Sequence, residues 1–157
     1  MLVMFVDGGC RNWGDKVGSY CALLVECEKE QILSTEKHGE LIYGIKSVCE
    51  AVTNNITELL AVIKGLEYCQ KRDMKKLDFI VTDSKYVERG INVWHYQWEK
   101  QNWNCSNGPV KNVALWKELV KLWYPQKEQG CNVIHTRGHS GVWWNEVCDQ
   151  QCSELMS

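Results

Sequence analysis

A strand–helix–strand succession in the first half of the chain constrains the fold more than any other feature. The apolar run Met1–Asp7 predicts one strand, and Leu77–Thr82 predicts another. Between them, Thr53-Asn54-Asn55 offers capping side chains for a helix that we expect to end near Arg72. A strand that is reached from a helix commonly pairs in parallel with the earlier strand, through a right-handed crossover. We therefore expect these two strands to run parallel in one sheet.

Three further stretches complete the predicted sheet. Gly18–Glu26 predicts a second strand and Gln31–Lys37 a weaker third, and the short turns favour an antiparallel meander with the first strand. Cys131–Thr136 predicts a fifth strand, and we interpret His38–Val52 as an irregular excursion. The fold class is therefore α/β, with a five-stranded mixed sheet of three antiparallel strands followed by two parallel ones.

Helices are expected to flank this sheet. Besides the helix after Asn55, the sequence predicts helices over Lys85–Gly90, Val93–Gln101, Val110–Trp123 and Asn145–Leu155. A chain of 157 residues can bury a core of its own, so we expect one domain over residues 1–157.

The start of the chain and its cysteines bear on the cellular compartment. The stretch MLVMFVDGG has no basic flank and soon meets an acid, which is not typical of a secretory signal. No apolar run reaches the length of about 18 residues that predicts a membrane span. None of the nine cysteines forms a Cys-x-x-Cys pair. We interpret them as reduced thiols of a cytoplasmic protein, in preference to a disulfide framework or a zinc site.

Charge and tryptophan are unevenly distributed along the chain. The segment Asn92–Lys127 holds five lysines and two glutamates, a charge of +3, so the net charge of −2 leaves −5 for the remainder. The same segment holds five of the eight tryptophans. This pattern suits a protein that grips nucleic acid with one part and binds metal cations with another. A pair of helices that packs its aromatic residues together is the alternative.

Four carboxylates are expected to meet at one place in this fold. Asp7 ends the first strand and Asp83 follows the parallel one, so both emerge at the carboxyl edge where open α/β sheets bind ligands. Glu58, in the first turn of the intervening helix, and Asp149, in the last helix, can reach the same edge. Asp78 is interpreted instead as a solvated loop acid.

Carboxylates that share a site repel one another, and one takes up a proton unless a divalent cation lies among them. Oxygen ligands without histidine or cysteine favour Mg²⁺ or Mn²⁺. Two such ions roughly 4 Å apart would hold the attacking and leaving oxygens of a phosphodiester displacement. Each acid taken alone has a plainer interpretation as a turn or cap residue.

Five motifs in order resemble those of the ribonuclease H type 1 family, over about Met4 to Leu155. VDGGC and TDSKYVERGI resemble its first and third acid motifs, and TNNITEL resembles the helix start that carries its glutamate. RGHSG followed by NEVCD resembles the last motif, with His139 and Asp149 ten residues apart. WHYQWEKQNW followed by PVKN resembles the substrate-gripping handle of bacterial members, here about residues 92–124.

The resemblance implies a ribonuclease H-like fold and an endoribonuclease that cuts the RNA strand of RNA–DNA hybrids. It implies that Asp7, Glu58, Asp83 and Asp149 ligate two Mg²⁺ ions, with Mn²⁺ as a possible substitute. Cleavage would leave a 5′ phosphate and a 3′ hydroxyl. His139 matches a mobile histidine that transfers a proton or assists metal and product release. Nothing resembles the separate hybrid-binding module of some eukaryotic members.

The resemblance also implies how the hybrid is gripped. Asn54 and Asn55 match positions that reach into the minor groove, where the 2′-OH distinguishes RNA. Thr53 and Asn112 match a pocket for a phosphate of the DNA strand. The full set of implied substrate contacts is Gly8, Cys10, Asn12, Thr53, Asn54, Asn55, Trp94, Trp98, Lys100, Trp103, Lys111 and Asn112.

Some residues depart from the family pattern. Glu99 and Gln101 stand where lysine or arginine is common, so the handle is less basic. Trp143 and Trp144 put two large aromatic residues where smaller or polar ones are expected, either to pack on the last helix or to narrow the site. The role of Asn12 is left open by a shorter loop after Asp7.

Two other functions stay open at the level of sequence. One is the ribonuclease H domain of a reverse-transcriptase-like system, and the other is a catalytically silent hybrid-binding module. The partner we expect is the RNA–DNA hybrid, with no membrane, and we expect the protein to be a monomer.

Overall fold

The computed structural model describes residues 1–11, 16–50, 53–74 and 76–157. Its main sheet has five strands in the order β3-β2-β1-β4-β7, and a small two-stranded sheet pairs β5 with β6. The strands are β1 (Leu2–Arg11), β2 (Val17–Glu26), β3 (Glu40–Glu50), β4 (Phe79–Thr82), β5 (Asn104–Cys105), β6 (Gly108–Pro109) and β7 (Asn132–His135). Among the described helices, none is long and apolar enough to cross a membrane.

The antiparallel half of the sheet corrects one prediction. Gln31–Lys37 is not a strand, because Lys29–Gln31 forms the 3₁₀ turn η1 and the chain then bends. The third strand is β3, which falls in the stretch interpreted as an irregular excursion. β3 is an edge strand with mostly exposed side chains, so its sequence lacks the alternation of buried and solvated residues that identifies a strand. Residues 51 and 52 of that stretch lie outside the described part of the chain.

The parallel half of the sheet is as predicted. β1 pairs in parallel with β4, and Val6 lies opposite Thr82 at the carboxyl end of the pair. β4 also pairs in parallel with β7, where Thr82 lies opposite His135. The sheet is therefore mixed, with three antiparallel strands followed by two parallel ones, and the predicted fold class is confirmed.

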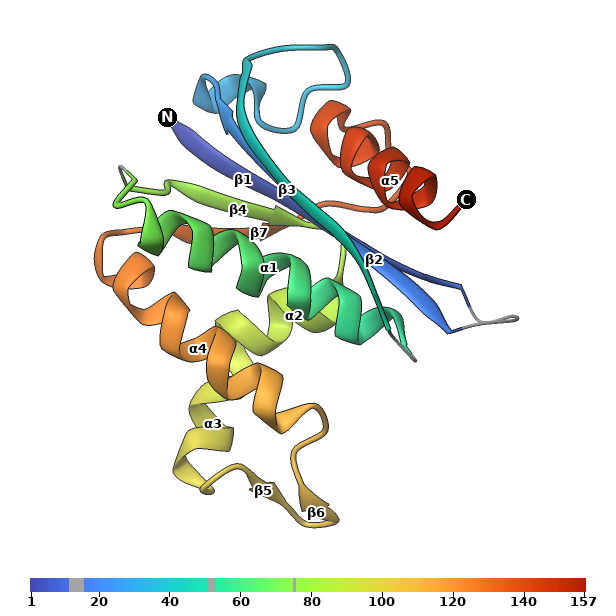
Figure 1. Ribbon diagram of the computed structural model, residues 1–157. Helices are drawn as coiled ribbons and strands as arrows, with labels where there is room; N and C mark the ends of the chain where they lie inside the picture. Colours follow the sequence, from blue (N-terminus) through green and yellow to red (C-terminus); the bar gives the residue numbers. More distant parts are fainter. Residues whose placement is uncertain (12–15, 51–52, 75) are drawn as a thin grey trace.

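Helices cover both faces of the sheet (Figure 1). They are α1 (Asn54–Lys71), α2 (Lys85–Arg89), the π-helical turn η2 (Gly90–Trp94), α3 (His95–Lys100), α4 (Val113–Glu128) and α5 (Trp143–Met156). α1 and α4 build one core with one face of the sheet, and α5 builds a second core on the other face. The predicted helix Val93–Gln101 is split, because its first residues continue η2.

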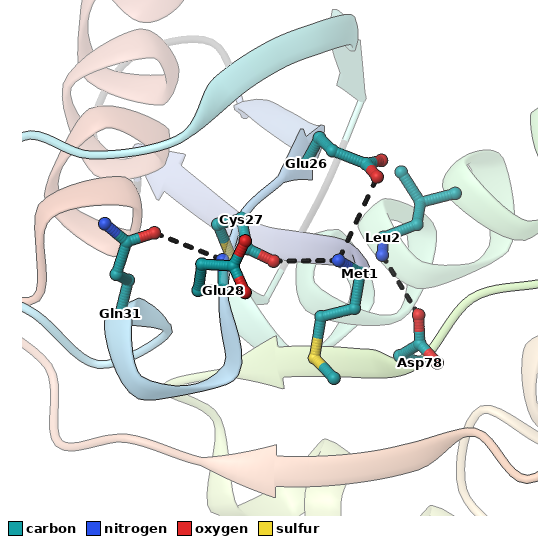
Figure 2. Close-up of polar contacts among 7 residues, drawn as sticks. All are labelled: Met1, Leu2, Glu26, Cys27, Glu28, Gln31 and Asp78. Carbon is teal, nitrogen blue, oxygen red and sulfur yellow. Dashed lines mark hydrogen bonds and ion pairs between the residues drawn. The ribbon is translucent and has the colours of Figure 1, made fainter.

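Hydrogen bonds hold the start of β1, at the edge of the sheet away from the carboxylates. Figure 2 shows Met1, which exchanges backbone hydrogen bonds with Cys27 at 2.8 and 3.0 Å. The Leu2 N–H donates to Oδ2 of Asp78 at 3.0 Å. Asp78 is therefore a partner of β1, and its interpretation as a solvated loop acid is wrong. Beside them the Glu28 N–H donates to the Gln31 side chain at 3.1 Å and stabilises η1.

Candidate active site

The approach of β1 to α1 is set by a glycine. A Cβ added at Gly8 would lie 2.5 Å from the carbonyl carbon of Thr57 and 2.6 Å from the backbone nitrogen of Glu58. β1 pairs with β2 as far as Arg11, so Asp7 lies inside the strand and not, as predicted, at its end, and Glu58 lies just past the first turn of α1 and not within it. Only a residue without a side chain lets β1 come this close to α1 at Gly8. This contact brings Glu58 beside Asp7.

Three of the four predicted carboxylates meet at the carboxyl edge of the sheet. One oxygen from each of Asp7, Glu58 and Asp83 lies within 4.8 Å of the others. Asp7 and Glu58 are buried, at 3% and 8% exposure, and Asp83 is half-buried. Asp7 Oδ1 accepts a hydrogen bond from the Gly8 N–H at 2.9 Å, whereas Oε2 of Glu58 is buried without a partner among the described residues. A buried carboxylate oxygen without a hydrogen-bond partner is available to ligate a cation.

Burial and mutual repulsion disfavour the charged forms of these acids. Burial raises the pKa of Asp7 to about 7, with repulsion from Asp83 adding to the effect. Burial raises the pKa of Glu58 well above its usual range, and the charge of Asp7 acts in the same direction. The pKa of Asp83 is raised by burial too, although a hydrogen bond with Asn145 opposes the shift. A divalent cation would remove this penalty, so the donor set suits Mg²⁺ or Mn²⁺.

The fourth carboxylate belongs to a neighbouring group. Asp149 lies with His139 and Glu146, whose possible ligand atoms are within 4.8 Å of one another. Its charge still contributes to raising the pKa of both Asp7 and Asp83, so the two groups adjoin electrostatically. Glu146 lies in the NEVCD stretch of the last motif, but the sequence did not predict a role for it. Its spacing of three residues from Asp149, which places both on one helix face, was the available signal.

His139 lies on a turn with an unusual backbone. Its φ is +57°, a left-handed conformation that few residues other than glycine adopt, and Gly141 has a φ of +90°. A Cβ added at Gly138 would lie 3.3 Å from Oδ2 of Asp83, so the turn passes directly beside the carboxylates. The Gly141 N–H points to Oε1 of Glu146 at 3.4 Å, which links the turn to α5.

The residues predicted to contact substrate at the start of α1 lie around this edge. Thr53 is the N-cap, and its hydroxyl accepts from the Ile56 N–H at 3.3 Å. Asn54 is exposed and Asn55 is half-buried, as is Cys10 on β1. Asn12 lies outside the described residues.

Asn112 reaches a residue that the sequence did not single out as a substrate contact. Its Nδ2 donates to the Tyr86 hydroxyl at 3.2 Å, and Trp116 Nε1 donates to the same oxygen at 2.8 Å. With both lone pairs accepting, the Tyr86 hydroxyl still has a proton to donate. Asn112 has a φ of +59°, and it precedes α4.

Some tryptophans of the handle pack inside the protein, and others are exposed or half-buried, where they could contact nucleic acid. Trp98 packs against Trp94, Trp103 and Trp116, with ring centroids 5.2 to 6.1 Å apart. Trp116 and Trp123 belong to the buried core, whereas Trp94 is 38% exposed. The cluster therefore has a buried base and an open face. The side chains of Lys100 and Lys111 are exposed on the same segment.

Glu99 faces the interior of the handle. Its Oε2 accepts from the Tyr124 hydroxyl at 2.8 Å and lies 3.1 Å from Nδ1 of His95, which is fully buried. This acid, which departs from the family pattern, is therefore used in joining α3 to α4.

Comparisons with known proteins find relatives along the whole chain. All of residues 1–157 match the family model described as RNase H. A Treponema denticola protein named Ribonuclease H is 32% identical over 172 residues, and the match covers 99% of each chain.

Two solved structures share the fold. LC9-RNase H1, described as a type 1 RNase H with the type 2 active-site motif, has a TM-score of 0.78 at 22% identity, over 98% of this chain and 70% of that one. A foamy viral protease-reverse transcriptase in complex with RNA/DNA hybrid has a TM-score of 0.77 at 14% identity, over 98% of this chain and 20% of that one. At these identities both show a likeness of fold alone.

Proposed function

Since the chain belongs to the ribonuclease H family, we propose that it is an endoribonuclease that hydrolyses the RNA strand of RNA–DNA hybrids. The observation that carries the proposal is the convergence of Asp7, Glu58 and Asp83 within 4.8 Å at one edge of the sheet. A silent binding module gains nothing from clustered carboxylates beside phosphates, because they repel the ligand. The convergence therefore favours catalysis over binding alone.

Two Mg²⁺ ions are the proposed cofactors, with Mn²⁺ as a substitute. Asp7, Glu58 and Asp83 would hold them together with Asp149, and the unpaired Oε2 of Glu58 and the raised pKa of Asp7 support a cation at this place. Bound Mg²⁺ would supply an activated water and stabilise charge on the departing 3′ oxygen. The proposed products are accordingly a 5′ phosphate and a 3′ hydroxyl.

The side chains of the adjoining group have different proposed roles. His139, exposed on its turn, would carry a proton to or from the reacting groups or assist product release. Asn145, which lowers the pKa of Asp83, would hold its carboxylate by donating a hydrogen bond from the side-chain amide. Asn145 is buried at 2% exposure, so it supports the site from behind and leaves the open side to substrate.

Selectivity for a hybrid is proposed to come from both strands. Asn54 and Asn55, beside the carboxylates, would read the 2′-OH of the RNA strand in the minor groove. The open face of the handle, with Trp94 at its rim, would pack against the deoxyribose of the DNA strand. A protein of the same fold was solved in complex with RNA/DNA hybrid, which supports the choice of ligand by analogy. Few of these contacts read base identity, so we expect weak sequence preference.

Incubation of the purified protein with end-labelled RNA–DNA hybrid, duplex RNA and duplex DNA tests the proposal. We expect cleavage of the RNA strand in the hybrid alone, with Mg²⁺ or Mn²⁺ but not with a chelator. Digestion of the products with a phosphate-dependent exonuclease would identify the 5′ phosphate. An intact hybrid in the presence of Mg²⁺ would contradict the proposed activity.

A further inference from the structure

We propose that Trp144 is a positioning residue, which fixes the turn that carries His139 through the connection between β2 and β3. This connection comprises residues 27–39, and the inference rests on the proposed function for its effect on catalysis. Trp143 and Trp144 stood out in the sequence as a departure from the family pattern, and no role in the active site accounts for them.

Trp144 joins α5 to the connection by a buried hydrogen bond. Its Nε1 donates to the backbone oxygen of His38 at 2.9 Å, and both residues are buried, at 6% and 8% exposure. The two rings meet edge to face with centroids 6.4 Å apart. A buried hydrogen bond of this kind leaves an unsatisfied carbonyl when its donor is removed. Trp144 therefore does not narrow access to the carboxylates and instead packs on the β2–β3 connection.

The connection also supplies the cap that α5 lacks. Val142 occupies the N-cap position and makes no side-chain capping hydrogen bond. The first N–H groups of a helix need partners from outside it. The N–H of Trp143 finds one in the backbone oxygen of Ser34, at 2.9 Å. The start of α5 is thus held by residues that lie more than a hundred positions earlier in the chain.

The connection is itself firmly held, so it can act as a fixed support. Ile32 is buried in the core beneath α5, at 4% exposure. At the start of the connection, Cys27 exchanges two backbone hydrogen bonds with Met1, and Glu28 and Gln31 cap η1 (Figure 2). Figure 1 shows the connection beside the start of α5.

The first turn of α5 carries this support into the active site. Asn145, next to Trp144, lies close enough to Asp83 to lower the pKa of its carboxyl, and Glu146 accepts from the Gly141 N–H at 3.4 Å. Thr35 also lies beside Gly141, since a Cβ added at this glycine would be 3.4 Å from Cγ2 of Thr35. The left-handed φ of His139 costs free energy that surrounding contacts must offset. Trp144 therefore stabilises the His139 turn indirectly, because its hydrogen bond with His38 joins the start of α5 to the connection.

Substitution Trp144→Phe tests the inference, because it keeps an aromatic ring and removes the N–H. The matched control is Trp123→Phe, since Trp123 is equally buried at 3% exposure but its Nε1 has no hydrogen-bond partner among the described residues. We expect Trp144→Phe to lower kcat about three- to tenfold with KM little changed. The expected loss is smaller than the full contribution of a proton-transfer group, because His139 is displaced only part of the time. Because Trp123 lies in the handle, Trp123→Phe is the control for stability and hydrogen exchange and not for the kinetic constants.

A double-mutant cycle separates positioning from a general loss of stability. If Trp144 acts through His139, Trp144→Phe should have little further effect on kcat in a His139→Ala background. Fully additive losses would overturn the inference. Thr35→Gly, which removes the side chain packed on Gly141, provides a second variant if Trp144→Phe does not fold.

Amide hydrogen exchange of the peptide spanning residues 138–146 gives a readout that needs no activity. Exchange should be faster in Trp144→Phe than in Trp123→Phe, because the turn opens more often. Equal exchange in the two variants would overturn the inference even if the enzyme cleaves hybrids. Faster exchange in a protein that cleaves nothing would instead leave the positioning role standing and contradict only the proposed function.

Discussion

Asp7 and Asp83 directly follow Val6 and Thr82, which lie opposite each other in the parallel pair of β1 and β4. β4 ends at Thr82 whereas β1 continues to Arg11, so the two carboxylates lie side by side where the parallel pairing stops. Glu58 joins them because Gly8 lets α1 approach. Burial and mutual repulsion of these acids affect the stability of the protein, which can be measured without substrate.

Removal of the Asp7 charge should stabilise the folded protein when a chelator keeps divalent cations from binding. Burial and the charge of Asp83 raise the pKa of Asp7 from 3.8 to about 7. Between these values the folded protein keeps a proton on Asp7 that the unfolded chain has released, so the contribution of Asp7 to stability is most favourable at low pH and is lost as the pH rises through the folded value. Asp7→Asn should therefore increase the free energy of unfolding at about pH 8 by about 1–4 kcal/mol and flatten its pH dependence.

Denaturant unfolding from about pH 4 to about pH 8, with a chelator and then with Mg²⁺, measures this effect. Mg²⁺ should stabilise the unchanged protein more than Asp7→Asn, since binding to the folded state adds stability. Equal pH slopes for the two proteins would contradict the raised pKa.

The substitution Asp83→Asn should abolish cleavage while hybrid binding persists. It removes a ligand charge but keeps the size of a half-buried side chain. We expect cleavage to fall by at least about 100-fold, because even partners behind a metal ligand contribute 10- to 100-fold. Gel-shift titration with hybrid and a cleavage assay measure the two properties. Asp73→Asn is a matched control, since Asp73 is exposed and its φ of +48° suits asparagine.

Gly8→Ala should disturb the site through the backbone. The new Cβ would overlap backbone atoms of Thr57 and Glu58, which cannot turn aside as a flexible side chain can. We expect a loss of stability of about 1–3 kcal/mol, as in other overpacked positions, together with a loss of cleavage. Gly44→Ala on the edge strand is the control, because its Cβ would meet only the end of the Leu23 side chain at 3.1 Å. Thermal unfolding and cleavage assays should rank the two variants in that order.

Trp94→Ala should weaken hybrid binding with little effect on folding. Its ring is 38% exposed at the rim of the aromatic cluster, so we expect the side chain to contribute more to hybrid binding than to the stability of the fold. Stacking on an aromatic side chain is worth about 1–3 kcal/mol in single-stranded complexes, and we expect a loss at the lower end of that range. Val93→Ala, at a neighbouring exposed residue, is the control. An unchanged hybrid affinity in Trp94→Ala would exclude this face from the interface.

Glu99→Ala should destabilise the handle and not strengthen hybrid binding. An acid that repelled phosphates would, when removed, increase affinity. Glu99 instead accepts from Tyr124 and contacts the buried His95. Its loss should lower the free energy of unfolding by about 1–3 kcal/mol, since it leaves polar groups without a partner. Glu118→Ala, at an exposed acid on α4, should change stability little, and tighter binding by Glu99→Ala alone would contradict the interior role.

The sequence determined the order of the elements because the relevant signals are local. Hydrophobic period, capping residues such as Thr53 and the strand–helix–strand succession act over a few residues, so the parallel pair and the meeting of Asp7, Glu58 and Asp83 could be predicted. β3 was missed because an edge strand buries few side chains and gives no alternating pattern. Its assignment depends on pairing with β2, which is a long-range interaction.

Tertiary structure alone decided the contacts between distant segments. The pairing of Trp144 with His38, the cap that Ser34 gives to α5, and the inward orientation of Glu99 leave no mark in the surrounding residues. The same holds for the division of the acids into one group with Glu58 and another with His139. Spacing along the chain fixes which face of an element a side chain occupies. The packing of whole elements against one another fixes what that side chain meets, because the free energy of burial depends on all the surfaces that come together.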